Sequence, residues 1–185
     1  MHCICLFSPG PTGKTFIGSN LSVALAKAGH QVVYMDASKI SCAATWFGGE
    51  KLPYYHPNLS LKVCPYDPQY LPSEGYLIIE TDQVEKIPDG ASVFLVIDSD
   101  FAHLVDVIQN ITSLHPEGII WNKADLTNNP GKRIPLPIVC QIPFYNDVNA
   151  RIQLGEPRAL VDETLSEVLV HIPTHKRMNT MVKNL

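Results

Sequence analysis

Short apolar runs recur along the chain, separated by longer stretches of helical or loop character. They occupy residues 4–7, 32–35, 61–64, 76–79, 93–97, 119–121 and 138–141. Such nearly continuous apolar runs are typical of strands that are buried on both faces. Because these runs alternate with helical segments, the pattern predicts an α/β fold with a mostly parallel sheet between helices.

Several of the predicted strands are followed at once by a polar residue. These residues are Asp36, Glu80, Asp98 and Asn122. The carboxyl ends of parallel strands meet at one edge of a sheet, and open α/β folds bind their ligands outside that edge. We therefore expect these side chains to gather beside a ligand site.

Three stretches have a helical pattern. Residues 17–28 place apolar side chains on one face and end at a glycine, which predicts an amphipathic helix. An apolar stripe over 101–111 follows a Ser-Asp start signal, and residues 161–172 form a final predicted helix. The segment 48–75 is rich in Pro, Tyr and Asn and contains a single predicted strand.

Residues 8–15 read Ser-Pro-Gly-Pro-Thr-Gly-Lys-Thr, the most informative motif of the chain. A phosphate-binding loop needs a glycine at its tight bend, a lysine that reaches the phosphates and a hydroxyl that ligates Mg²⁺. Gly13, Lys14 and Thr15 supply these parts, although Ser8 stands where the full pattern has glycine. The alternative is a Gly/Pro turn with an ordinary surface lysine. The strand before the loop and the helix after it favour the phosphate loop, since a helix N-terminus attracts anions.

Composition and charge narrow the class of protein. The chain has 185 residues, 45% of them hydrophobic and 17% charged, which predicts one domain over 1–172 followed by a tail over 173–185. A net charge of -4 argues against a nucleic-acid surface made by bulk charge. We find no leader-like start and no apolar run near membrane-spanning length, so the expected location is the cytoplasm.

Cysteine and histidine residues give no metal signal. The five cysteines are odd in number and lack paired metal-ligand spacing, which fits reduced thiols. The seven histidines also lack such spacing. Trp46-Phe47-Gly48 and Tyr54-Tyr55 are assigned to packing under a loop, with an aromatic patch for a partner as the alternative.

The motifs, taken in order, resemble the ParA/MinD family of P-loop ATPases, the SIMIBI-class branch with a deviant phosphate loop. The segments that carry the resemblance are the loop with its helix, Val32-Val33-Tyr34-Met35-Asp36, Leu77-Ile78-Ile79-Glu80-Thr81, Ala91-Ser92-Val93-Phe94-Leu95-Val96, Asn122-Lys123-Ala124-Asp125, Gln141-Ile142-Pro143-Phe144 and Leu154-Gly155-Glu156-Pro157. The resemblance implies a three-layer P-loop NTPase fold that binds ATP or ADP with Mg²⁺. It also implies a protein partner or a homodimer, and roles in positioning cellular machinery.

The resemblance also implies a set of site residues. The nucleotide-binding residues would be Gly10, Thr12, Gly13, Lys14, Thr15, Phe16, Asn122, Asp125 and Pro143. The metal would be held by Thr15, Asp36 and Glu80. Asn122 matches an amide that the family uses against adenine, while Asn-Lys-x-Asp ending at Asp125 is also the guanine signature of GTPases. The sequence leaves ATP and GTP both open, and the resemblance favours ATP.

Three departures from the family pattern concern catalysis. Pro9 and Pro11 replace a lysine and a glycine of the deviant loop, and a proline has no N–H to offer a phosphate oxygen. Ser38 replaces the second acid of an Asp-x-Asp motif, and a serine cannot act as a base near neutral pH. Glu80-Thr81-Asp82-Gln83 replaces Asp-Thr-Pro and its following glycine. Because phosphoryl transfer depends on positioned charge, we predict weak or absent hydrolysis, with no residue assigned as catalytic.

The sequence therefore predicts a degenerate ParA/MinD-like nucleotide-binding protein, at most a weak ATPase, that acts through partners. The alternative is an active Mg-ATPase switch that dimerises on ATP. The tail is similar to the membrane-targeting helices that end some MinD-like proteins. Its few apolar residues predict weak or no membrane binding.

Overall fold

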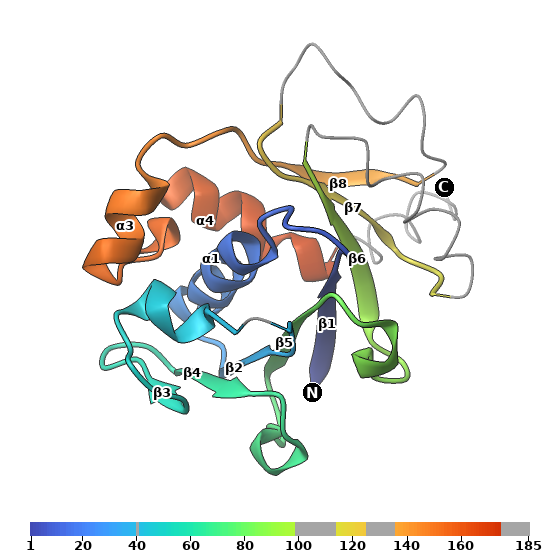
Figure 1. Cartoon of the computed structure of the whole chain (residues 1–185), viewed down its shortest axis with the longest axis horizontal. Helices are drawn as coiled ribbons and strands as arrows, with labels where there is room; N and C mark the ends of the chain where they lie inside the picture. Colours follow the sequence, from blue (N-terminus) through green and yellow to red (C-terminus); the bar gives the residue numbers. More distant parts are fainter. Residues whose placement is uncertain (40, 99–113, 125–135, 175–185) are drawn as a thin grey trace.

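The computed structural model describes residues 1–39, 41–98, 114–124 and 136–174. Within them one eight-stranded sheet has the order β3-β4-β2-β5-β1-β6-β7-β8, and every neighbouring pair is parallel except β3 with β4 (Figure 1). The strands are β1 His2–Phe7, β2 Val32–Asp36, β3 Tyr54–Tyr55, β4 Leu61–Pro65, β5 Tyr76–Thr81, β6 Ser92–Ile97, β7 Gly118–Trp121 and β8 Ile138–Gln141. The predicted α/β class and its mostly parallel sheet are confirmed.

Three α-helices are described: α1 Lys14–Lys27, α3 Val148–Leu154 and α4 Glu163–Val170. Short 3-10 segments include η1 Ala43–Phe47 and η6 Arg158–Leu160. Helix α1 packs against both the sheet and α4, over the largest apolar cluster of the core (Figure 1). Two further apolar clusters lie among the strand residues that point away from this cluster. The helix predicted at 101–111 and most of the tail lie outside the described residues. None of the described helices is long and apolar enough to cross a membrane.

All seven predicted strands are present, and two elements were missed. Strand β3 has two residues and pairs antiparallel at the edge of the sheet, so it carries no periodic signal. Helix α3 has no buried residue, and the sequence therefore lacks the apolar stripe by which a helix is recognised. The final helix was predicted to begin at 161 but begins at Glu163, because the Asp162 side chain accepts a hydrogen bond from the Leu165 N–H at 2.9 Å and caps it.

The prediction of an amphipathic first helix is wrong. Helix α1 is buried from Phe16 to Ala26, including its polar residues Ser19, Asn20 and Ser22. These three side chains bond to backbone groups, either of α1 itself or, for the Asn20 carbonyl oxygen, of Ala159. The helix is buried all round because the sheet lies on one side of it and η6 and α4 lie on another.

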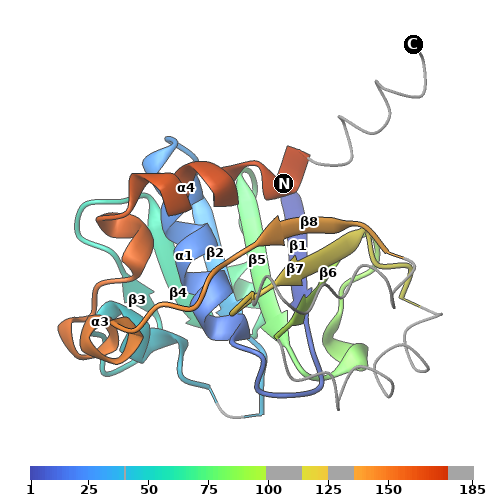
Figure 2. The same cartoon turned by 90° about the horizontal axis from the view of Figure 1, so that it is seen from above.

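Two glycines bring η1 and α3 together, and Figure 2 shows these segments side by side. A Cβ at Gly155 would lie 2.5 Å from the Gly48 backbone, and Gly155 has a φ of 65°. Gly155→Ala should lower the free energy of unfolding by about 3 kcal/mol, since it combines left-handed strain with overpacking. The measurement is urea denaturation followed by circular dichroism.

Gly90→Ala is the matched control for this prediction. Gly90 also has a positive φ, 75°, but a Cβ there meets nothing within 4 Å. It should therefore cost only about 1 kcal/mol, the strain of the left-handed conformation. Equal losses in the two variants would show that the contact between Gly48 and Gly155 is not tight.

Candidate functional site

The predicted phosphate loop lies between β1 and α1, as the motif requires. Gly13 has a φ of 85° at the N-cap of α1, and a Cβ there would collide with the Asn122 side chain. The Lys14 ammonium donates to the Gly10 carbonyl at 2.8 Å, and Lys14 is only 8% exposed. Burial lowers the pKa of Lys14, while the acidic side chains of Glu80, Asp82 and Asp36 oppose this shift.

Thr15 and Glu80 form the centre of the predicted metal site. The Thr15 hydroxyl donates to Glu80 Oε1 at 2.9 Å, and Glu80 is completely buried. Burial, reinforced by the neighbouring Asp36 side chain, raises the pKa of Glu80 to about 8. The Tyr34 and Thr15 hydroxyls oppose this rise of the pKa. Neither the Tyr34 hydroxyl nor Glu80 Oε2 has a partner within hydrogen-bond distance among the residues that the structure describes. Glu80 thus holds the Thr15 hydroxyl from behind the loop.

Asp36, also predicted as a metal ligand, anchors the loop that follows β2. Its carboxylate accepts from the backbone N–H groups of Ser38, Cys42 and Ala43 and from the Ser41 hydroxyl, at 2.8–3.1 Å. It is 4% exposed. These four bonds orient the start of η1, so in this structure Asp36 acts on the shape of the site through the loop.

A cavity of about 510 Å³ opens beside the phosphate loop. Its wall includes the loop, the segment after β2 and the segment after β5; the residues are Pro9, Gly10, Pro11, Gly13, Lys14, Thr15, Phe16, Ser38, Lys39, Cys42, Trp46 and Asp82. Oxygen ligands suit Mg²⁺, which keeps several waters in most sites. The oxygen-bearing side chains of this wall are the Thr15 and Ser38 hydroxyls and the Asp82 carboxylate, and buried Glu80 bonds to Thr15.

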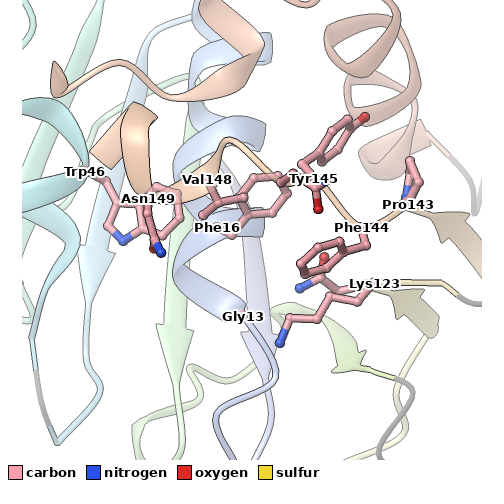
Figure 3. Close-up of a pocket in the computed structure, with 11 residues that line it drawn as sticks. Gly13, Phe16, Trp46, Lys123, Pro143, Phe144, Tyr145, Val148 and Asn149 are labelled. Carbon is pink, nitrogen blue, oxygen red and sulfur yellow. The ribbon is translucent and has the colours of Figure 1, made fainter. Parts of the chain in front are cut away.

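A second cavity, of about 290 Å³, adjoins the first and shares Gly13, Phe16 and Trp46 with it. Figure 3 shows the aromatic side chains that surround it. Phe16 lies edge-on to Trp46 with centroids 5.8 Å apart, and its ring is 6.0 Å from that of Tyr145. Asn122 and Pro143, both predicted beside a base, also line this cavity. The two cavities therefore adjoin at Gly13, Phe16 and Trp46, with Lys14 and Thr15 in one and Tyr145 in the other.

Asn122 belongs to both halves of the site. Its amide nitrogen donates to the Thr12 carbonyl at 2.9 Å, and the residue is 3% exposed. Asn122 therefore ties the end of β7 to the phosphate loop as well as lining the aromatic cavity. Thr12 is buried, its hydroxyl has no hydrogen-bond partner in the described part of the chain, and it does not line either cavity. Asp125 lies outside the described residues.

Charged side chains hold the outer wall of the aromatic cavity in place. The Arg158 guanidinium lies 3.9 Å from the centre of the Tyr145 ring. It also pairs with Asp147 at 2.6 Å and with Asp162 at 2.9 Å. Because these contacts link the segment before α3 to the start of α4, the position of Tyr145 beside Phe16 is well defined.

The structure thus brings Gly10, Gly13, Lys14, Thr15 and Phe16 to one cavity, and Asn122 and Pro143 to the adjoining one. Sequence reasoning did not assign Lys39, Trp46 or Tyr145 to the site. Trp46 was assigned to packing, and it is indeed 9% exposed, yet its remaining surface lines both cavities. The packing assignment is wrong for Tyr55, which is 64% exposed on the edge strand β3. No spacing rule could have found these residues, because they come from loops and short elements that only the fold brings together.

Comparisons with solved structures support the fold. No protein-family model and no curated protein matches the chain. Among solved structures, the MinC:MinD cell division protein complex of Aquifex aeolicus superposes with a TM-score of 0.77 at 18% identity, over 97% of this chain and 96% of that one. A ParA family ATPase from Chlorobium tepidum TLS gives 0.74 at 16% identity, over 94% and 99%. The septum site-determining protein MinD with Mg-ADP from Pyrococcus horikoshii OT3 gives 0.71 at 16%, over 93% and 94%. The chain has the α/β P-loop fold of these ATPases.

Proposed function

We propose that this protein binds ATP or ADP with Mg²⁺ and acts through a protein partner, with weak or no hydrolysis. The observation that carries the proposal is the pair of adjoining cavities, one lined by Lys14 and Thr15 and the other by aromatic rings, which meet at Gly13. A nucleotide has the same two parts, an anionic end and a flat aromatic end. Solved structures of the same fold contain Mg-ADP, ADP and AMPPNP.

Each part of the site would have a defined task. Lys14 and the N-terminus of α1 bind the phosphates, because both present positive charge to the loop. Thr15 ligates Mg²⁺, which neutralises phosphate charge when bound. Phe16 and Phe144 offer apolar faces to the base, and Asn122 is one of the polar side chains that line the same cavity.

A titration of the purified protein with ATP, ADP and GTP, with and without Mg²⁺, tests binding. We expect ATP and ADP to bind more tightly with Mg²⁺, and ATP to be preferred to GTP. A preference for GTP that disappears in Asp125→Ala would show that the protein recognises guanine and not adenine. If no nucleotide binds, the proposed function is wrong, and only the assignment of the fold stands.

We further predict that turnover stays near background at saturating ATP and Mg²⁺. The wall of the phosphate cavity includes Pro9, Pro11 and Ser38. Pro9 carries no charge, Pro11 has no backbone N–H, and Ser38 has no carboxylate. Loss of one positioned charge in a transition state costs about 10²–10³-fold in rate, although such effects need not add. Phosphate release measured over hours against a protein-free blank checks this prediction.

Substitutions that restore the missing groups supply the comparison. The triple variant Pro9→Lys, Pro11→Gly and Ser38→Asp should hydrolyse ATP at least about tenfold faster than wild type, because it returns charge and an N–H to the cavity wall. The variant Lys51→Ala, a change at an exposed lysine outside both cavities, should leave the rate unchanged. Rapid wild-type hydrolysis that requires Lys14 would contradict the prediction.

That outcome would favour the second candidate function, an active Mg-ATPase switch that dimerises on ATP. Asp82 is the observation in its favour, because this acid lines the phosphate cavity where Ser38 offers no carboxylate. Light scattering after size exclusion, with and without ATP and Mg²⁺, would report dimerisation.

For either function we propose a cytoplasmic protein that works with a partner, since one solved structure of this fold is a MinC:MinD complex.

A further inference from the structure

Lys39 is a second lysine on the wall of the phosphate cavity. It lies in the loop after β2, is exposed, and makes no hydrogen bond or ion pair with any residue that the structure describes. Lys14, the other lysine of this wall, is instead buried and bonded to the Gly10 carbonyl. The ammonium of Lys39 is therefore available to a ligand in the cavity.

The backbone on both sides of Lys39 is held by one buried carboxylate. Asp36 accepts from the Ser38 N–H at 3.1 Å, and from Cys42 and Ala43 at 2.8 and 3.0 Å. Anchors this close limit how far the loop can move away from the cavity. A lysine presented from such a loop loses less conformational freedom when it binds than one on a free loop.

Lys39 lines the phosphate cavity and not the aromatic cavity that would hold the base. Gly13, Phe16 and Trp46 line both cavities, whereas Lys39 lines the phosphate cavity alone. The same holds for Pro9 and Pro11, which carry no charge. A phosphate chain that extends from Gly13 into this cavity would therefore share it with the side chains of Lys14 and Lys39.

The charged side chains on the wall of the phosphate cavity favour an anionic ligand. Lys14 and Lys39 are positive and Asp82 is negative, with Asp82 Oδ1 accepting from the Gln83 side chain at 3.3 Å. Glu80 is completely buried behind Thr15, and Asp36 is used by the loop backbone. Polyphosphate is the ligand chemistry that two lysines and a helix N-terminus recognise together.

We propose that Lys39 is a second phosphate-binding residue that contacts the terminal phosphate of a nucleoside triphosphate and so distinguishes triphosphate from diphosphate. The proposal rests on the proposed function, because it assumes that a nucleotide occupies the two cavities. In this role Lys39 supplies a cation from the loop after β2, on the same cavity wall where Pro9 carries no charge.

Binding titrations with ATP, ADP and inorganic tripolyphosphate test the proposal, each with Mg²⁺ and at two salt concentrations. Lys39→Ala should weaken ATP and tripolyphosphate about tenfold, as expected for loss of one exposed charge-assisted hydrogen bond, and weaken ADP about twofold at most. Lys39→Arg keeps the charge and should stay within about threefold of wild type. Lys51→Ala, which removes the same charge outside the cavities, should change none of these affinities.

The outcomes separate this proposal from the proposed function. Equal losses for ATP and ADP, or the same loss in Lys51→Ala, would overturn the role of Lys39 while nucleotide binding stands. Tripolyphosphate binding that needs Lys39, without binding of any nucleotide, would overturn the proposed function and the discrimination between triphosphate and diphosphate nucleotides, and would leave Lys39 as a phosphate-binding residue. Absence of all binding would overturn both. Thermal unfolding of Lys39→Ala should match wild type, because the side chain is exposed and makes no bond with a described residue.

Discussion

Lys14→Ala should weaken ATP binding about 100-fold, a larger loss than any other single change in the site. The Lys14 ammonium is buried in the phosphate loop, 2.8 Å from the Gly10 carbonyl, so water screens its attraction for a phosphate less than at an exposed lysine. Charge-assisted hydrogen bonds contribute about 1.5–3 kcal/mol, which corresponds to about 10–150-fold in affinity. Isothermal titration calorimetry with ATP and Mg²⁺ measures the loss.

Two controls accompany this substitution. Lys51→Ala should bind ATP like wild type, because Lys51 lines neither cavity. Thr15→Ala should lose mainly the Mg²⁺-dependent part of the affinity, since it removes the hydroxyl and keeps the lysine. Unchanged ATP affinity in Lys14→Ala would show that the loop after β1 is not the phosphate site.

Raising the pH from 4.5 to 9 should destabilise the ligand-free protein relative to Glu80→Gln by on the order of 4 kcal/mol. The pKa of Glu80 is about 8 in the folded protein, against about 4.3 in an unfolded chain. Between these values the folded state binds one proton more, so its stability falls as the pH rises through this window. The stabilising contribution is complete below the unfolded pKa and lost above the folded one.

Urea denaturation of both proteins across this pH range, in EDTA and without nucleotide, measures the difference. Glutamine resembles the protonated acid in shape and charge, and its amide oxygen can still accept from the Thr15 hydroxyl. The two proteins should therefore differ least near pH 4.5 and most near pH 9. A difference that stays constant with pH would mean that Glu80 is ionised when buried, and that the Thr15 hydroxyl bonds to a charged carboxylate.

Local sequence pattern was sufficient for the central part of the fold. A continuous apolar run predicts each buried strand, because a strand that is covered on both faces has apolar side chains on both. The phosphate loop is equally local: Gly13, Lys14 and Thr15 are consecutive, and the strand and helix beside them are visible in the same stretch. The four polar residues after the strands were expected at one edge. Glu80 and Asn122 do contact the loop that follows β1.

The tertiary structure alone decided how these residues are used. Asp36 was expected at a metal, but four nearby donors engage its carboxylate and make it the anchor of the following loop. Helix α1 is buried on all sides, which its own periodicity could not show, because burial depends on what packs against it.

By itself, the amino-acid sequence determined the seven parallel strands and the phosphate loop, since each depends on neighbouring residues in the chain. Only the tertiary structure decided the aromatic cavity and the placement of Lys39. The cavity joins Phe16 from α1, Trp46 from η1 and Tyr145 from the segment before α3. Such contacts arise from the packing of distant segments, and their physical cause is burial of apolar surface, which has no fixed spacing along the chain.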